Sequence, residues 1–194
     1  MTAAETAAET AAEYVRTVEG FGTVRIDRVD PEGDAALLHH WVTAERARFW
    51  GMGGTTLEQV REIYAHLDSL TTHHGFLVRR DGEPVALFQT YEPEADRVSE
   101  CYEALPGDIG VHLLIAPATI PERGFSGGLL AVLTDFALIG RNRIVAEPDA
   151  ANEKAIALLV RAGFDLGPEV VLPEVDLPEV FIPEKKARLA FLTR

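Results

Sequence analysis

The order of apolar and polar positions divides this 194-residue chain into short segments typical of an α/β protein. Residues 23–29 alternate apolar and polar side chains, which is the period of a half-buried strand. Asp30-Pro31 ends that strand, and Asp34 stands at the N-cap position of a helix predicted over residues 35–42. The pattern therefore predicts a strand and then a helix near the start of the chain.

A second helix is predicted over residues 55–67, where apolar side chains recur at helical spacing. Thr55 and Glu58 stand three residues apart at its start, which is the spacing of a capping box. Residues 75–80 and 84–91 then form two apolar-rich segments joined by Asp-Gly, a dipeptide that favours a tight turn. These segments predict a β-hairpin.

The stretch from Gly107 to Phe164 is the most regular part of the chain. Residues 108–116 predict a long apolar strand, and residues 129–139 are apolar nearly all round, which predicts a buried helix. Residues 143–147 predict a short strand, and residues 151–162 predict a helix that ends before a glycine. Residues 97–105 are a weaker strand candidate.

The two ends of the chain carry little apolar periodicity. Residues 1–20 are rich in Ala and Glu and are expected to be a disordered tail, which leaves a single domain over 21–194. Residues 172–184 are rich in proline and are expected to form an extended loop inserted into that domain. The last residues, ARLAFLTR, predict a final strand.

Composition narrows the class of protein. The apolar fraction is 47% without any run of the roughly 20 apolar residues that span a bilayer. A net charge of −13 argues against a nucleic-acid or anionic-membrane partner. The acidic N-terminus is unlike a signal peptide, and the lone Cys101 is typical of a reducing compartment, so a cytoplasmic location is expected.

A Gly-rich turn opens the buried helix, where free amides and the helix dipole suit a pyrophosphate. The order strand, Gly-rich turn, helix, strand, helix resembles the acyl-CoA-binding half of the GNAT N-acyltransferases. Four short motifs in this stretch are similar to those of the GNAT branch that makes siderophore hydroxamates. They are His-Leu-Leu-Ile, Arg-Gly-Phe, Glu-Pro-Asp-x-x-Asn and Ala-Gly-Phe. The resemblance implies a GNAT domain, with a mixed, bent β-sheet flanked by helices, that uses acetyl-CoA or succinyl-CoA.

His112 lies inside the long apolar strand and shares a face with Gly110 and Leu114. One interpretation is a core histidine satisfied by a hydrogen bond. The other is a general base, since a neutral imidazole accepts a proton near pH 7. The resemblance favours the base, and it implies that the strand amides of Leu113 and Ile115 hold the oxyanion in a cleft where this strand splays from the next.

Glu147-Pro148-Asp149 ends the following strand. Asp149 has two open interpretations, an N-cap of the next helix or an acid that faces His112 and orients the substrate N–OH. The resemblance implies the second, and it makes Asn152 and Lys154 lesser candidates for cofactor contacts.

The phosphate turn departs from the general GNAT pattern, because Ser126 stands where the first glycine is usual. Its predicted cofactor-binding residues are Arg123, Gly124, Phe125, Ser126, Gly127 and Gly128. An aromatic segment near the N-terminus resembles the acceptor side of these enzymes, with core packing as the alternative. Its candidate substrate-binding residues, with one from the hairpin, are His40, Trp41, Phe49, Trp50 and Tyr91.

The histidines at 66, 73 and 74 complete no ligand set at a zinc-like spacing, so no metal is expected. The resemblance implies an acyl-CoA-dependent N-acyltransferase that forms a hydroxamate by direct transfer in a ternary complex. Its partner would be a small amine or hydroxylamine such as N-hydroxycadaverine or N6-hydroxylysine. The alternatives are a lysine N6-acyltransferase of the mycobactin type, a general small-amine (for example aminoglycoside) acetyltransferase, and a catalytically silent acyl-CoA-binding domain.

Overall fold

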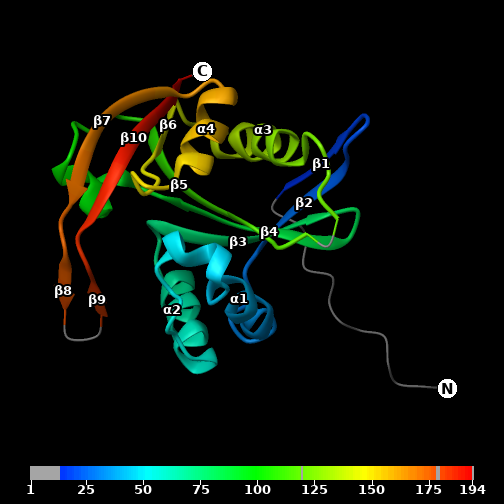
Figure 1. The fold of residues 1–194 in the computed structure, drawn as a ribbon, viewed down its shortest axis with the longest axis horizontal. Helices are drawn as coiled ribbons and strands as arrows, with labels where there is room; N and C mark the ends of the chain where they lie inside the picture. The colour runs from blue at the N-terminus through cyan, green and yellow to red at the C-terminus, as the bar shows by residue number, and fades with distance from the viewer. Residues whose placement is uncertain (1–13, 119, 178–179, 194) are drawn as a thin grey trace.

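The computed structural model describes residues 14–118, 120–177 and 180–193 (Figure 1). The strands of this part are β1 (Tyr14–Val18), β2 (Gly22–Arg28), β3 (His73–Arg80), β4 (Glu83–Tyr91), β5 (Asp108–Ile115), β6 (Arg143–Ala146), β7 (Asp165–Leu172), β8 (Val175–Leu177), β9 (Val180–Ile182) and β10 (Lys185–Thr193). Among the described residues, eight of them form one sheet in the order β1-β2-β3-β4-β5-β6-β10-β7. Its neighbours are antiparallel except for β5 and β6, which run parallel, so the predicted mixed sheet is confirmed.

Helices cover both faces of the sheet (Figure 1). Along β3 and β4 successive side chains point to opposite faces, so Leu77 and Leu87 pack under one helix layer while Phe76 and Phe88 pack under the other. The first layer holds α1 (Ala35–Val42), the short 3-10 helix η1 (Glu45–Trp50) and α2 (Leu57–Ser69). The second layer holds α3 (Phe125–Ala137) and α4 (Glu153–Arg161). The connection from β4 to β5 carries η2 (Pro93–Ala95) and η3 (Arg97–Glu100).

The sheet forks between β5 and β6. Their parallel pairing runs only from Asp108↔Arg143 to Gly110↔Val145. Beyond Gly110 the strand β5 continues to Ile115 alongside β4, while β6 stays paired with β10. This parting of two adjacent strands confirms the splay that was expected next to His112.

A buried ion pair closes the narrow end of the fork. Asp108 is 4% exposed, and its carboxylate accepts hydrogen bonds from Arg143 over 2.8 and 2.6 Å. The same carboxylate accepts from the Leu105 amide and the Tyr102 hydroxyl. Burial alone would raise the pKa of Asp108, but Arg143 and these donors outweigh it and hold the pKa below its ordinary value. The charged clamp thus fixes the first residues of β5 to the first residues of β6.

Several local predictions are confirmed. The helix over 35–42 has the predicted bounds, and Asp34 precedes it although its side chain makes no capping hydrogen bond. The hairpin turns at Asp81 and Gly82, both with positive φ, as a tight Asp-Gly turn requires. The capping box is present one residue later than predicted, between Thr56 and Gln59.

Other predictions were wrong. The disordered tail expected over 1–20 is wrong for its last part, because Tyr14–Val18 forms β1 against β2. Residues 1–13 lie outside the described part. The loop expected over 172–184 contains the β8–β9 hairpin, which projects beyond the sheet (Figure 1). Residues 97–105 hold the 3-10 helix η3 rather than a strand.

Candidate active site

His112 and Glu147 meet across the fork, one from each strand. The last paired residues are Gly110 and Val145, and His112 and Glu147 follow two positions later, so both return to the same face. The imidazole Nε2 hydrogen-bonds to a carboxylate oxygen of Glu147. The side chain of His112 is 34% exposed and that of Glu147 is 3% exposed. The imidazole therefore borders the open side of the fork, with a buried carboxylate behind it.

Tyr91 and Gly110 support Glu147 from beneath. The Tyr91 hydroxyl donates to the second carboxylate oxygen of Glu147 over 2.7 Å, and its ring centroid lies 5.0 Å from that of His112. Tyr91 is the direct partner of Gly110 between β4 and β5. A Cβ placed on Gly110 would lie 2.0 Å from the Tyr91 ring. The absence of a side chain at Gly110 thus lets this ring lie directly against the β5 backbone.

The charge of this cluster is set by its surroundings. Burial alone would raise the pKa of Glu147, but the charge and hydrogen bond of His112, the Lys185 ammonium and the Tyr91 hydroxyl outweigh it, so the pKa lies below its ordinary value. Burial raises the pKa of Tyr91 well above its ordinary value, and the charge of Glu147 adds to this shift. At neutral pH a buried carboxylate therefore faces a neutral phenol and can stabilise a positive imidazole.

The other ring nitrogen of His112 faces Gln89. Nδ1 lies 3.3 Å from the Gln89 Oε1, and the Gln89 amide donates in turn to the Tyr64 hydroxyl over 3.4 Å. A tautomer that donates Nε2–H to Glu147 leaves a lone pair on Nδ1. Once protonated there, the imidazolium has an oxygen acceptor at both nitrogens. Both ring nitrogens of His112 therefore have a polar partner among the described residues.

Strand geometry turns two predicted amides toward the fork. Ala116 donates its amide to Val85 at the start of β4 over 2.9 Å. Amide directions alternate along a strand, so those of Leu113 and Ile115 point away from β4 and toward the side on which β6 has departed. The fork therefore places two backbone donors beside His112.

The predicted aromatic wall is only partly at this site. The ring of Trp50 stands edge-on to His112, with centroids 6.2 Å apart. Tyr91 lies beneath the site rather than on its wall, and Trp41 is 4% exposed within the core under α1, as the packing alternative predicts. Phe49 is half-buried beneath the Arg48 guanidinium, and His40 is exposed.

Asp149 is not the acid that touches His112. Its side chain accepts from the Ala151 amide over 2.8 Å, and its backbone bridges to Ala187. The N-cap of α4 is Asn152, whose side chain accepts from the Ala155 amide, so Asp149 is not the helix cap either. Lys154 is exposed in the first turn of α4. Asp149 thus lies two residues past Glu147, on the same side of the fork.

The predicted phosphate turn forms the start of α3. Gly124 is its N-cap with φ of 80°, and the amides of Ser126 and Gly127 are absent from the backbone hydrogen bonds of the described residues. Phe125 and Gly128 face inward: the Arg80 guanidinium lies 4.8 Å from the Phe125 ring, and a Cβ on Gly128 would meet Phe21 at 2.8 Å. Nothing lies within 4 Å of a Cβ on Gly127. The turn therefore presents open donors on its outer side, next to the exposed Arg123.

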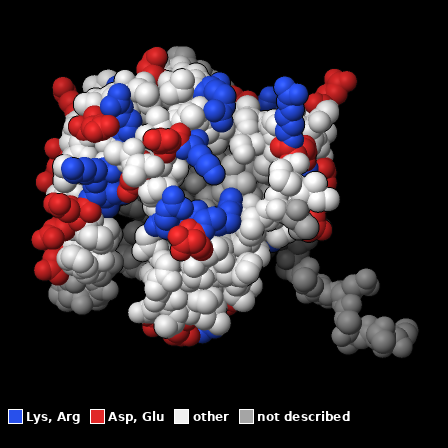
Figure 2. Space-filling model, in the orientation of Figure 1, with Lys and Arg blue, Asp and Glu red and all other residues white. Residues whose placement is uncertain are grey.

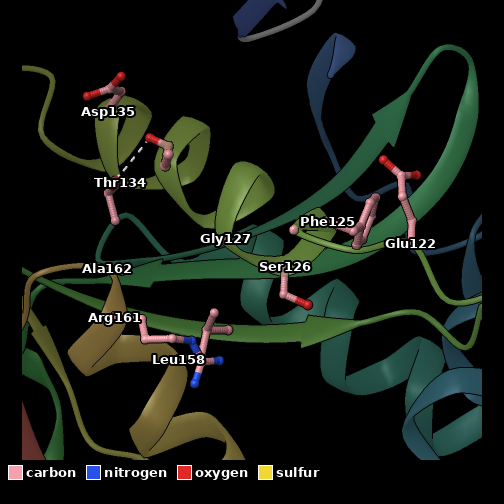
Figure 3. A pocket seen from close by; sticks show the side chains of 11 residues that line it. Glu122, Phe125, Ser126, Gly127, Thr134, Asp135, Leu158, Arg161 and Ala162 are labelled. Carbon is pink, nitrogen blue, oxygen red and sulfur yellow. Dashed lines mark hydrogen bonds between the residues drawn. The ribbon is translucent and has the colours of Figure 1, made fainter. Parts of the chain in front are cut away.

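A cavity of about 700 Å³ adjoins this turn, between α3 and α4 (Figure 3). Its lining joins the turn to the facing side of α4, and it includes Glu122, Gly124, Phe125, Ser126, Gly127, Thr134, Asp135, Leu158, Arg161 and Ala162. Arg161 is a cation that the sequence analysis did not select, because its contribution depends on how α4 packs beside α3. Glu147 was also missed, although a carboxylate directly after the buried apolar residues Ile-Val-Ala of β6 was a signal for it.

The described residues contain no group of three or more His, Cys, Asp and Glu side chains that could hold a metal ion. Of the helices in the described part, none has the length and apolar character needed to cross a membrane.

The sequence matches a family model described as an acetyltransferase (GNAT) domain over residues 30–172. It is 28% identical over 142 residues to a protein from Escherichia coli named N(6)-hydroxylysine O-acetyltransferase, covering 70% of this chain and 44% of that protein. It is also 28% identical over 138 residues to a lysine N-acyltransferase MbtK from Mycobacterium sp. (strain MCS), covering 69% of this chain and 56% of that one. The chain thus spans about half the length of these named relatives.

Solved structures share the fold. An aminoglycoside acetyltransferase AAC(6')-Ib, solved with paromomycin and acetyl-CoA, superposes with a TM-score of 0.73 at 24% identity, covering 88% of this chain and 93% of that one. A spermidine N-acetyltransferase from Vibrio cholerae, solved with CoA and spermine, has a TM-score of 0.65 at 15% identity, covering 88% and 95%.

Replacing Gly110 tests how the cluster is packed. We expect Gly110→Ala to lower the free energy of unfolding by about 1–3 kcal/mol, because the new methyl must displace the Tyr91 ring. In a Tyr91→Ala background the same change should cost much less, and urea unfolding of the four proteins gives the coupling. Gly127→Ala is the control: it adds a methyl in open space on a helix and should be neutral or slightly stabilising. An undiminished cost without the Tyr91 ring would contradict this packing.

Proposed function

Because the chain belongs to the GNAT acetyltransferase family, we propose that it is an acyl-CoA-dependent N-acyltransferase that acts on an N-hydroxylated small amine and forms a hydroxamate. The observation that carries the proposal is the pair of His112 and Glu147 at the fork. It supplies a base backed by a buried carboxylate, beside two strand amides that point toward the space between β5 and β6.

The acyl donor would approach from the side of α3. Open amides at Ser126 and Gly127, with the cationic side chains of Arg123 and Arg161 near them, suit the phosphates of coenzyme A. Bound acyl-CoA supplies an activated thioester carbonyl. The backbone N–H groups of Leu113 and Ile115 would hydrogen-bond to the oxygen of that carbonyl inside the fork and stabilise it as it becomes negative.

The acceptor nitrogen would attack the thioester carbon directly. Its lone pair forms the new C–N bond, the C–S bond breaks, and the sulfur leaves as a thiolate. His112 accepts the proton that the nitrogen loses, and Glu147 stabilises the resulting imidazolium; that proton then neutralises the thiolate. Asp149, next along the same side of the fork, would orient the acceptor N–OH. We see no need for a covalent acyl-enzyme in this scheme.

The hydroxylamine acceptor is the finer part of the proposal. A hydroxylamine nitrogen is less basic than an alkylamine, so it is uncharged and nucleophilic at neutral pH without strong activation. A relative named for N(6)-hydroxylysine supports this choice, although its name assigns the acetyl group to oxygen. A plain lysine or another small amine is the second candidate, supported by the relative named lysine N-acyltransferase.

The single cysteine, free and half-buried, fits a cytoplasmic enzyme.

An assay with matched acceptors tests the reaction class. We expect the purified protein to consume acetyl-CoA or succinyl-CoA with N6-hydroxylysine or N-hydroxycadaverine at least tenfold faster than with lysine or cadaverine. The product should bind ferric iron with the colour of a hydroxamate, which an O-acyl hydroxylamine does not give. Equal rates with lysine would favour the second candidate, and a product without the ferric colour would assign the transfer to oxygen.

Two substitutions test the catalytic assignments. His112→Ala should lower kcat by about two to four powers of ten, the usual contribution of a positioned general base. Asp149→Asn keeps the shape of the side chain and removes its charge, so it should lower activity by about a hundredfold if Asp149 orients the N–OH. The exposed His66→Ala is the control for histidine loss. Full activity of either His112→Ala or Asp149→Asn would remove that residue from the mechanism.

The cofactor assignment can be tested without turnover. Coenzyme A alone should raise the melting temperature, because it binds only the folded state. Gly127→Glu places a carboxylate among the open amides and should abolish that rise, while Arg123→Ala should only reduce it. Gly53→Glu adds the same charge in another open loop and should keep the full rise. An unchanged rise in Gly127→Glu would show that the turn does not hold the phosphates.

A further inference from the structure

A guanidinium that none of the steps above uses reaches the fork. Arg46 lies on η1, between α1 and α2, and its side chain hydrogen-bonds to the backbone oxygen of Ile115. The carbonyl of a strand residue points to the same side as its amide, and Ile115 turns that side toward the fork. Arg46 therefore extends from the α1–α2 layer to the open edge of β5.

The charge of Arg46 lacks a carboxylate partner among the residues that the structure describes. Arg80 and Arg143, by contrast, pair with Glu122 and Asp108 at 2.6 Å. Figure 2 shows a hollow near the centre of the view that is bordered by several Lys and Arg side chains, with acidic side chains beside them, although the chain carries a net charge of −13. A cation left without an acid in so acidic a protein is available to an anionic group of a substrate.

Arg46 stands on the acceptor side of the fork. His112 and Trp50 lie on the face that α1, η1 and α2 cover, whereas the turn at the start of α3 lies on the opposite face. A donor held at that turn enters from one face, and an acceptor that meets His112 enters from the other. An anionic group that binds Arg46 therefore belongs to the acceptor rather than to coenzyme A.

We propose that Arg46 binds the carboxylate of an amino-acid acceptor and thereby selects an N-hydroxylated amino acid over the corresponding diamine. This inference rests on the proposed function. Ile115 is three residues from His112, which is roughly 10 Å along an extended strand. A lysine-sized acceptor spans roughly 7 Å from its terminal nitrogen to its carboxylate, and a hydrogen bond of roughly 3 Å at each end extends its reach to roughly 13 Å. An acceptor of this size is therefore long enough to contact His112 with one end and the guanidinium beside Ile115 with the other.

Binding and turnover of two acceptors that differ in the carboxylate provide the test. N6-hydroxylysine and N-hydroxycadaverine share the reacting end, and the second lacks only the carboxylate. With coenzyme A present, calorimetry should show that Arg46→Gln weakens binding of N6-hydroxylysine by about tenfold to a hundredfold, the range for a charge-assisted hydrogen bond. Binding of N-hydroxycadaverine should change less than twofold. In turnover the loss should appear in KM rather than in kcat.

Arg48→Gln is the matched control, because Arg48 lies on the same short helix but stacks on Phe49, 4.6 Å from its ring centroid. It should leave both acceptors unchanged. Arg46 is exposed, so its replacement should not alter the melting temperature of the free protein. Equal losses for the two acceptors, or none for either, would overturn the assignment, as would a wild-type protein that binds both equally.

The acyl donor is the other source of a carboxylate. If Arg46→Gln raises KM for succinyl-CoA but not for acetyl-CoA, whichever acceptor is present, then the guanidinium reads the acyl group and our assignment is wrong. A reduced melting-temperature rise with coenzyme A alone would place Arg46 against the cofactor and would also overturn it. Because the binding measurements need no turnover, they separate this inference from the proposed reaction: selective binding without hydroxamate formation would refute the reaction alone.

Discussion

The parting of β5 from β6 after Gly110 is the constraint on which the rest of the molecule depends. Paired strands satisfy each other's amides and carbonyls, so two strands that separate inside a sheet must hold their free edges in another way. The Asp108–Arg143 ion pair fixes the narrow end, and His112 with Glu147 bridges the first step of the gap. Beyond that bridge the edge of β5 is met by the side chain of Arg46 at the backbone oxygen of Ile115. Charged side chains therefore hold the narrow end of the fork in place, while the amides of Leu113 and Ile115 face its open end.

The bridge also explains how a charged carboxylate persists in the interior. Glu147 is nearly inaccessible, and desolvation by itself would favour its neutral form. It is compensated by an imidazole, a phenol and an ammonium that come from β5, β4 and β10. Because each partner belongs to a different strand, the buried charge is fully compensated only when the sheet is assembled. The close approach of Tyr91 in turn requires glycine at position 110.

Local sequence signals predicted most of the fold. The elements and residues that they missed depend on strand pairing between segments far apart in the sequence. Short-range sequence patterns determine the Asp81-Gly82 turn, the α1 helix and the buried α3 helix, so they were predictable from the sequence. His112 was selected correctly as a residue of the fork, but its acid partner was not. The choice between Glu147 and Asp149 depends on the register of β5 against β6, which no local pattern records. The same holds for β1 and for the β8–β9 hairpin, whose short segments form strands only against a partner.

The two helix layers have a consequence for how such a protein diversifies. The face under α3 and α4 and the face under α1, η1 and α2 share little except the strands between them. Substitutions on η1 can therefore accumulate without disturbing the turn that begins α3. On the proposed function, the acceptor can then change during evolution while the acyl donor stays the same. Gene duplication followed by drift in the segment between α1 and α2 is the simplest route to new specificities. Paralogues should then differ most in that short segment and least around the fork.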